Sequence, residues 1–183
     1  MTDQERLRAL LLERSLSRGD FVLSSGQRSS YYIDARKTTM SAAGLGVIGR
    51  LGLAAIREAG WKPGAVGGLT MGADPVAYAI ARASLDDAPE VDAFSVRKAL
   101  KGHGTKKLIE GRFEAGIPVV VVEDVITSGE SALQAISAVR EAGGVVLGVV
   151  AVVDRRQGGT ERIQTGGIRV VSLTTINDLG ANL

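Results

Sequence analysis

The sequence predicts an α/β fold with an open, mostly parallel sheet flanked by helices. Five apolar runs lack polar alternation, which is typical of strands buried on both faces of a sheet. They span 65–69, 91–96, 118–123, 145–154 and 168–175. Helical patterns over 73–84 and 131–143 lie between them. The 183 residues, 45% of them apolar, suit a single core, so we expect one domain over 1–183.

The N-terminal region predicts a helix followed by a pair of short strands. Thr2 and Glu5 have the spacing of a capping box, and the leucines that follow lie mostly on one face, so we expect a helix over 3–15. Residues 21–37 alternate around a turn at Ser25-Gly26, which is typical of a hairpin.

A second helical pattern extends over 41–59 and is followed by Gly60, a residue type favoured just past the end of a helix. Glycines inside a helix are unusual, and here they predict close packing against another backbone. They are Gly44, Gly46, Gly49 and Gly52.

The composition excludes several kinds of site. The chain has no cysteine, which rules out disulfides, thiolate metal sites and cysteine nucleophiles. Its single histidine, His103, makes a multi-histidine zinc site within one chain implausible. A net charge of +2 predicts nucleic-acid binding only where basic residues cluster. No segment reaches the roughly 18 consecutive apolar residues of a membrane span, and the N-terminus shows no secretory pattern, so we expect a soluble, cytoplasmic protein.

Polar residues follow the predicted strands, where ligands bind in open parallel sheets. These strand ends cover 69–74, 97–107, 123–131 and 154–159. In the third, VVVVEDVITSGES, we expect the strand to end at Glu123 and Asp124, just before a helix. Free N–H groups at a helix start, with hydroxyls and Gly129 nearby, favour a phosphate. Two carboxylates beside it suit the hydroxyls and magnesium of a phosphorylated ribose.

The residues of this stretch allow two interpretations. Either Glu123 and Asp124 cap the helix while Gly129 shapes a turn, or the same residues bind a ligand. The order of four apolar residues, two acids, two apolar residues and Thr-Ser-Gly resembles the phosphoribosyl diphosphate motif of the type I phosphoribosyltransferases. The resemblance implies that Glu123 and Asp124 hold the ribose hydroxyls, with Asp124 also catalytic. It implies that the 5-phosphate is held by Thr127, Ser128, Gly129, Glu130 and Ser131.

Further stretches resemble one branch of that family, the orotate phosphoribosyltransferases: FVLSSGQRSSYYIDAR, GLTMGADPVA, FSVRKALKGHG and VVDRRQGG. The resemblance implies an orotate pocket formed by Tyr31, Tyr32, Thr127 and Arg155. Aromatic rings would face the flat pyrimidine, and the guanidinium would bind its carboxylate. The alternative for either tyrosine is ordinary core packing, because strand alternation sends the two rings to opposite faces. The neighbouring Arg156 is expected in solvent.

The segment 97–107 carries five basic residues, His103 and no acid. Alone, it is typical of a solvated or nucleic-acid-binding loop. The resemblance implies instead a mobile catalytic loop, with Lys101 and His103 as the catalytic pair and Arg97 and Lys98 at the pyrophosphate. It also implies a homodimer in which each loop reaches the neighbouring subunit, with no role in binding nucleic acid.

The residues around the pyrophosphate depart from one branch of the family. Thr70, Met71 and Gly72 match the loop that holds pyrophosphate, but that branch has lysine where Ser24 stands and Tyr-Lys in place of Met71-Gly72. The ligand roles of Ser24 and Met71 are therefore left open. Because fewer fixed cations surround the pyrophosphate, the basic loop is expected to supply more of the positive charge.

The resemblance therefore predicts an enzyme of pyrimidine biosynthesis. It implies that orotate and phosphoribosyl diphosphate give orotidine 5'-monophosphate and pyrophosphate. It implies Mg²⁺, held mainly by phosphoribosyl diphosphate and water, with Glu123 and Asp124 as candidate protein ligands. The implied fold has a small hood formed by residues 1–40 and the C-terminal segment. Two alternatives stay open: a phosphoribosyltransferase for another nucleobase, and a regulator that senses phosphoribosyl diphosphate on the same fold.

Overall fold

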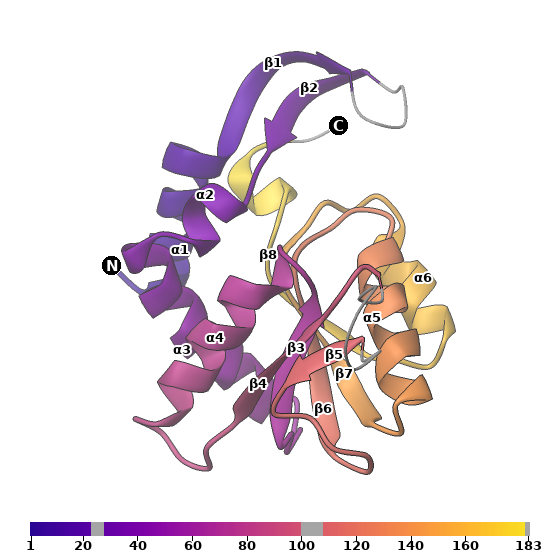
Figure 1. Cartoon of the computed structure of the whole chain (residues 1–183). Helices are drawn as coiled ribbons and strands as arrows, with labels where there is room; N and C mark the ends of the chain where they lie inside the picture. Colours follow the sequence, from indigo (N-terminus) through magenta and orange to yellow (C-terminus); the bar gives the residue numbers. More distant parts are fainter. Residues whose placement is uncertain (23–27, 100–107, 182–183) are drawn as a thin grey trace.

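The computed structural model describes residues 1–22, 28–99 and 108–181. In this part of the chain a six-stranded sheet forms the centre, with helices on both faces (Figure 1). Its strands are β3 (Ala65–Leu69), β4 (Asp92–Val96), β5 (Ile109–Gly111), β6 (Pro118–Ile126), β7 (Val145–Asp154) and β8 (Val170–Thr175). The order across the sheet is β5-β4-β3-β6-β7-β8, and every pairing is parallel except that of β4 with β5. The predicted open, mostly parallel α/β sheet is confirmed.

Helices cover the sheet on both sides. The longer ones are α1 (Asp3–Leu10), α3 (Ala42–Glu58), α4 (Ala73–Ser84) and α5 (Glu130–Glu141), and the short ones are α2 (Arg36–Thr39) and α6 (Gly159–Thr165). α3 and α4 pack on one face, with α1 against α3, and α5 and α6 lie on the other. Alternation along β6 divides its side chains between the two cores, since Val119 and Val121 pack with α5, whereas Val120 and Val122 join the core beneath α3 and α4.

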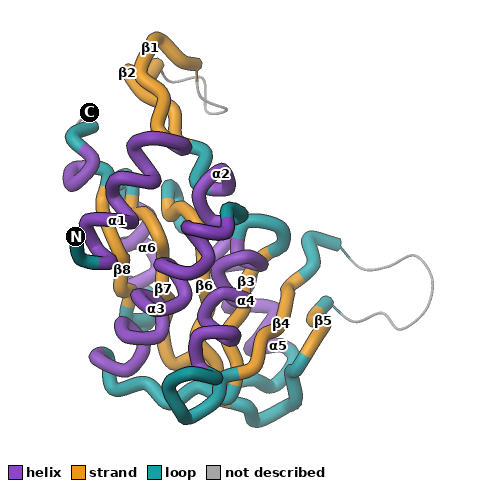
Figure 2. Tube along the Cα trace, turned by 90° about the vertical axis from the view of Figure 1, so that its left-hand side faces the viewer, coloured by secondary structure: helices purple, strands orange, loops and turns teal. Residues whose placement is uncertain are grey.

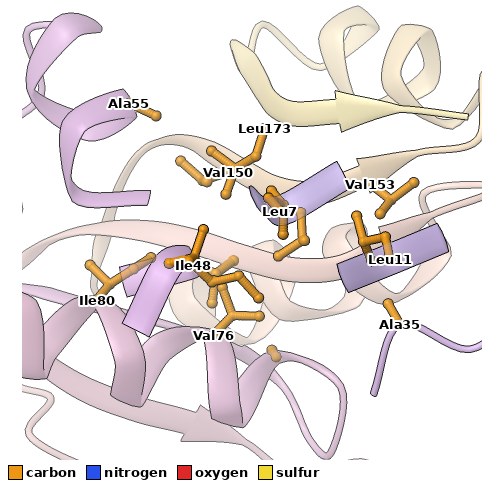
Figure 3. Packing of buried hydrophobic residues seen from close by; sticks show 14 of the residues in the cluster. Leu7, Leu11, Ala35, Ile48, Ala55, Val76, Ile80, Val150, Val153 and Leu173 are labelled. Atoms are coloured by element: carbon orange, nitrogen blue, oxygen red, sulfur yellow. The ribbon is translucent and has the colours of Figure 1, made fainter. Parts of the chain in front are cut away.

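Figure 3 shows the core beneath α3 and α4 from close by. Ile48 of α3 and Val76 and Ile80 of α4 lie against the sheet, and Leu7 and Leu11 from the N-terminal helix lie beside β7. All five side chains are fully buried, at 0% exposure, and each contributes on the order of 1.5 to 3 kcal/mol of hydrophobic stabilisation. The N-terminal helix is therefore part of this core. No helix in the described ranges is long and apolar enough to cross a membrane.

The N-terminal helix forms over the predicted range, but in two parts. α1 begins with the predicted capping box, in which Thr2 Oγ1 accepts a hydrogen bond from the Glu5 N–H and the Glu5 carboxylate accepts one from the Thr2 N–H. From Leu11 to Ser15 the chain continues as a π-helical turn. The helix predicted over 3–15 is thus confirmed.

A separate antiparallel pair, β1 (Leu16–Val22) and β2 (Arg28–Ile33), stands beyond the end of the large sheet (Figures 1 and 2). The predicted strand pair is confirmed, but its first strand begins at residue 16 and not at 21. Most of this strand is exposed, so no apolar alternation marks its start. The Arg18 guanidinium donates to the Gly180 carbonyl at 3.0 Å, which links the pair to the C-terminal 3-10 turn. The turn predicted at Ser25-Gly26 lies outside the described residues.

Glycines allow α3 to pack closely on its neighbours. A Cβ on Gly44 would clash with the backbone just before α3, and one on Gly49 would clash with the backbone of α4, so the prediction is confirmed for both. A Cβ on Gly52 would meet a side chain of α4. For Gly46 the prediction is wrong, because its nearest neighbour, at 3.8 Å, is a side chain of α3 itself.

The strand β6 is longer than predicted. It continues to Ile126 because Val125 and Ile126 pair with Val153 and Asp154 of β7. The prediction that the strand ends at Glu123 and Asp124 is therefore wrong, and both carboxylates lie within it. The sequence interpretation also missed α2, α6 and the three-residue β5.

Candidate active site at the carboxyl ends of the strands

A cavity of about 320 Å³ opens where the carboxyl ends of β3, β6 and β7 meet. Its wall includes at least one residue from each of the four predicted strand ends. The lining residues are Tyr32, Ile33, Asp34, Ala35, Arg36, Leu69, Thr70, Met71, Gly72, Lys98, Glu123, Asp124, Val125, Thr127, Ser131 and Arg155. Larger hollows of about 640, 690 and 730 Å³ occur elsewhere in the described structure, away from these strand ends. The chemistry of the lining, not its size, marks the 320 Å³ cavity as the candidate site.

The carboxyl groups of Glu123 and Asp124 both reach the cavity, although alternation along a strand starts the two side chains on opposite faces of β6. Glu123 is buried, and its burial, followed by the charge of Asp124, raises its pKa to about 9. Glu123 is therefore protonated at neutral pH. Asp124 is half-buried, and its Oδ1 accepts a hydrogen bond from the Val125 N–H at 2.8 Å. The pair thus offers a neutral acid and a carboxylate to the hydroxyl groups of a ligand.

The turn between β6 and α5 has the features of an anion site. α5 begins directly after Gly129, which has a left-handed φ of 76°, and no side chain caps this helix start within the described residues. Its N–H groups and helix dipole therefore face a small cavity of about 110 Å³ enclosed by the turn and Glu123. Gly159 of α6 supports the turn, since a Cβ there would lie 2.5 Å from the Thr127 carbonyl oxygen. The predicted phosphate residues 127–131 are thus brought together.

Arg162 of α6 is a cation at this turn that the sequence interpretation missed. Its guanidinium lies 2.8 Å from the Glu130 carboxylate and donates to the Ser128 carbonyl at 3.3 Å. The Glu130 side chain is therefore engaged with α6. No motif marked Arg162, because α6 itself was not predicted.

Arg155 lies at the end of β7, with its guanidinium 5.2 Å from the centre of the Tyr31 ring. Both side chains are buried, and within the described residues Nε and Nη2 of Arg155 have no hydrogen-bond partner. The buried cation therefore keeps donors for a ligand. Tyr32 lines the cavity, whereas Tyr31 lies in the core outside the cavity wall. The predicted separation of the two rings is confirmed, and the core-packing alternative applies to Tyr31.

Asp154 holds the loop that presents Arg155. Its buried carboxylate accepts hydrogen bonds from the Arg156 N–H at 2.7 Å and from the Thr160 hydroxyl at 3.0 Å. Arg156 has a left-handed φ of 55° and an exposed side chain, as expected. The sequence interpretation missed Asp154, although an acid at the last position of a buried strand was an available signal.

Asp34 and Arg36 form a second pair that the sequence interpretation missed. They follow β2 and line the cavity, with Arg36 Nε 2.8 Å from Asp34 Oδ1. The hydrogen bond from Arg36 lowers the pKa of Asp34, and the pKa of Arg36 is raised by Asp34 first and also by the charge of Asp124. Arg36 therefore supplies a fixed cation close to Asp124. The available signal was the Asp-Ala-Arg sequence just after the paired tyrosines.

The loop at 70–72 joins β3 to α4 along the cavity wall. The peptide between Thr70 and Met71 is cis, and the Met71 side chain is exposed. Gly72 lies so close to the acidic pair that a Cβ would be 2.6 Å from Asp124 Oδ1. The predicted pyrophosphate loop is thus in contact with the predicted ribose site.

The basic segment reaches the cavity through its described residues. Lys98 lines the cavity, and Arg97 Nη1 lies 3.5 Å from the carboxylate of Glu110 on β5. Lys101 and His103, the predicted catalytic pair, lie outside the described residues, as does Ser24.

The comparisons with known proteins agree with the predicted family. A family model described as the phosphoribosyl transferase domain matches residues 41–179. Over 182 residues the chain is 47% identical to the orotate phosphoribosyltransferase of Aquifex aeolicus (strain VF5), covering 98% of each protein. The structure of this chain is similar to that of Mycobacterium tuberculosis H37Rv orotate phosphoribosyltransferase in complex with Fe(III) dicitrate. The TM-score is 0.88, the sequence identity is 44%, and the match covers 98% of this chain and 99% of that one. The complex of the same protein with 5-phospho-α-D-ribosyl 1-diphosphate gives a TM-score of 0.84, 42% identity and the same coverage.

Proposed function

Because the chain belongs to the orotate phosphoribosyltransferases, we propose that it transfers the 5-phosphoribosyl group from phosphoribosyl diphosphate to orotate. The products are orotidine 5'-monophosphate and pyrophosphate, in the biosynthesis of UMP. One observation supports this most directly: a single sheet edge carries an uncapped helix start, a pair of acids and a buried guanidinium with free donors among the described residues. These groups match the phosphate, the ribose and the orotate carboxylate.

The proposed mechanism is a displacement at the anomeric carbon. The bond from this carbon to pyrophosphate breaks, and its electron pair leaves with pyrophosphate. A bond to a ring nitrogen of orotate forms, and the proton of that nitrogen passes to the pyrophosphate or to solvent. Positive charge grows on the ribose and negative charge on the leaving group, so groups already fixed at those positions lower the barrier. Asp124 faces the ribose, Lys98 and the 70–72 loop face the pyrophosphate, and the start of α5 holds the 5-phosphate.

The base site is proposed from Arg155, Tyr32 and Thr127. Arg155 binds the orotate carboxylate, and Tyr32 and Thr127 line the same cavity beside the pyrimidine. A phosphoribosyltransferase for purines or uracil is the alternative. Those bases carry no carboxylate, so they would leave a buried guanidinium without an anionic partner, which is costly.

Mg²⁺ is part of the proposal. The described residues contain no group of three or more His, Cys, Asp or Glu side chains that could hold a metal ion. Asp124 still offers a half-buried carboxylate to the cavity. This donor set fits an ion bound mainly through phosphoribosyl diphosphate and water, with Asp124 and the ionised form of Glu123 as protein ligands. Once bound, the ion would neutralise part of the charge on the pyrophosphate.

A homodimer with shared sites is also part of the proposal. Lys101 and His103 are proposed to act at the neighbouring subunit's site, assisted by Arg97 and Lys98. The sheet order supports this, because β4 and β5, the strands on either side of residues 100–107 in the sequence, lie at one edge of the sheet and not at its centre. The β1–β2 pair and the C-terminal turn are proposed to form the hood over orotate. A cytoplasmic location completes the proposal and is checked by cell fractionation.

An assay of the purified chain tests the function. Orotate absorbance is followed with and without phosphoribosyl diphosphate and Mg²⁺, and uracil, adenine and hypoxanthine are tested side by side. Consumption of orotate that needs both additions is the expected result. Consumption of another base alone would establish the other phosphoribosyltransferase, whereas binding of phosphoribosyl diphosphate without turnover would support the regulator.

A further inference from the structure

We propose that Asp74 is a positioning residue for the pyrophosphate side of the site. Its carboxylate fixes the 70–72 loop relative to the strand that leads to Arg97 and Lys98. The inference rests on the proposed function, because it concerns how this chain holds phosphoribosyl diphosphate. Neither the family motif nor the resemblance assigned a role to Asp74.

One carboxylate joins three elements of the fold. Asp74 lies in the first turn of α4 and is half-buried. Its Oδ2 accepts a hydrogen bond from the Thr70 hydroxyl at 2.6 Å, and its Oδ1 accepts one from the Ser95 hydroxyl at 2.7 Å. Such short hydroxyl-to-carboxylate distances are typical of strong, charge-assisted hydrogen bonds. Because Thr70 follows β3 and Ser95 belongs to β4, Asp74 ties both strand ends to α4.

Both connections lead directly into the cavity. The Thr70 N–H donates to the Val96 carbonyl at 2.8 Å, and Lys98 lies two residues further along the chain on the cavity wall. On the other side Thr70 leads to Gly72, where a Cβ would lie 2.6 Å from Asp124 Oδ1. A displacement of this loop therefore changes the pyrophosphate wall and its spacing to the acidic pair together.

The alternative for Asp74 is an acid that stabilises the start of α4 through the helix dipole. That role needs the negative charge but no hydroxyl partners. Asn has the same shape without the charge, and a hydroxyl can turn to donate to its carbonyl or accept from its amide. Asp74→Asn therefore preserves the proposed connections and removes the dipole role, whereas Asp74→Ala removes both.

Four variants and one control test the proposal in the full-length protein. The variants are Asp74→Ala, Asp74→Asn, Ser95→Ala and the double variant that combines Asp74→Ala with Ser95→Ala. The control is Asp86→Ala, which removes an exposed acid just beyond the end of α4 that pairs with Arg82. The readouts are KM for each substrate, calorimetric binding of pyrophosphate with Mg²⁺, and the thermal midpoint of unfolding. Asp74→Ala is expected to raise KM for phosphoribosyl diphosphate by about tenfold or more, since two hydrogen bonds are lost. KM for orotate should change less than about twofold, and pyrophosphate binding should weaken in parallel.

The hydrogen bonds that connect Thr70, Asp74 and Ser95 lead to two further expectations. Asp74→Asn should restore most of the phosphoribosyl diphosphate affinity, and Asp74→Ala combined with Ser95→Ala should be no worse than Asp74→Ala alone, because both changes break the same connection. Equal increases in both KM values would overturn the proposal, as would additive effects or a lower thermal midpoint with unchanged pyrophosphate binding. If Asp74→Ala does not fold, Ser95→Ala carries the same test. It is expected to raise KM for phosphoribosyl diphosphate about threefold or more, because the Ser95 hydroxyl loses its hydrogen bonds to the Asp74 carboxylate at 2.7 Å and to the Tyr78 hydroxyl at 3.1 Å. A wild-type chain that binds pyrophosphate but leaves orotate unchanged would refute the proposed function, not the role of Asp74.

Discussion

The guanidinium of Arg155 lies 5.2 Å from the centre of the Tyr31 ring, and both side chains are buried. β2 supplies the ring and the residue directly after β7 supplies the cation, so the position of the proposed orotate anchor is set by packing in the core. Desolvated cation–π contacts are worth about 2 kcal/mol. A cation held out of water also attracts a carboxylate more strongly than one in solvent.

Replacing Tyr31 tests whether the ring acts on orotate through Arg155. Tyr31→Leu is expected to raise KM for orotate about tenfold and to leave KM for phosphoribosyl diphosphate near its original value, because the guanidinium loses its support. Tyr31→Phe keeps the ring, and within the described residues the Tyr31 hydroxyl has no hydrogen-bond partner. Phe should therefore retain normal kinetics and at least the original stability. A large KM increase in Tyr31→Phe would show instead that the hydroxyl contacts orotate.

Replacing Arg155 tests the anchor itself, and the adjacent Arg156 provides a matched control. Arg155→Ala is expected to cost about 1.5 to 3 kcal/mol in kcat/KM for orotate, since a charge-assisted contact to the carboxylate is lost. Discrimination between orotate and uracil should fall with it. Arg156 is exposed and pairs with Asp154, so Arg156→Ala should leave discrimination intact. Normal orotate kinetics in Arg155→Ala would place the base elsewhere.

The buried strands were predicted correctly because a strand that is buried on both faces appears in the sequence as an apolar run without polar alternation. The prediction failed at β6, where Glu123 and Asp124 interrupt the run but pairing with β7 carries the strand on to Ile126. Apolar pattern cannot detect such a continuation, because it is set by backbone hydrogen bonds to a neighbour distant in sequence. The sequence also did not predict where the exposed β1 begins or that the short α6 exists. The reason is related, since neither element has a long apolar face.

The motif residues were easier to predict than the residues that hold the motif loops in place. VVVVEDVITSGES placed the acids and the phosphate turn on one strand end, and the structure brings both to the same sheet edge. Asp34, Asp74 and Asp154 escaped notice because each acts through a hydrogen bond to a residue nearby in the chain, and a single acid in a sequence does not show what it will face. Tyr31 was predicted to line the orotate pocket together with Tyr32, because alternation alone does not say which of two adjacent rings is buried.

The raised pKa of Glu123 predicts a pH-dependent stability. The folded state keeps the Glu123 proton up to a pKa of about 9, whereas the unfolded state releases it near the ordinary value of 4.5. Between these values the folded state binds more protons, so this group lowers the free energy of unfolding as pH rises, by at most about 1.4 kcal/mol per pH unit. Glu123→Gln removes that dependence. Its stability relative to wild type should therefore increase steadily between pH 5 and pH 8.

Urea unfolding across this pH range measures the effect, with Glu90→Gln as the control because Glu90 is exposed. The control should follow wild type at every pH. A constant difference between Glu123→Gln and wild type would mean that Glu123 is ionised in the folded protein. Addition of phosphoribosyl diphosphate should raise the stability of wild type by binding the folded state.

The shared site predicts a complementation between two inactive variants. Arg155 and Asp124 line one cavity within a single chain, whereas Lys101 is proposed to act on the neighbouring subunit. In a two-fold dimer the basic segment of each subunit would then act at the site of the other subunit. Lys101→Ala and Arg155→Ala chains, each nearly inactive alone, are mixed and allowed to exchange subunits, and exchange is verified by native mass spectrometry.

In a mixed dimer one site combines both defects, and the other has the intact cavity of the Lys101→Ala chain with the intact basic segment of the Arg155→Ala chain. Random pairing makes about half of the dimers mixed, so activity should approach about a quarter of wild type if the two sites work independently. If Lys101 served its own cavity, every site in the mixture would keep one defect and activity would not recover. Verified exchange without recovery would therefore exclude a contribution of Lys101 across the interface and would leave the reaction at the Arg155 cavity unaffected.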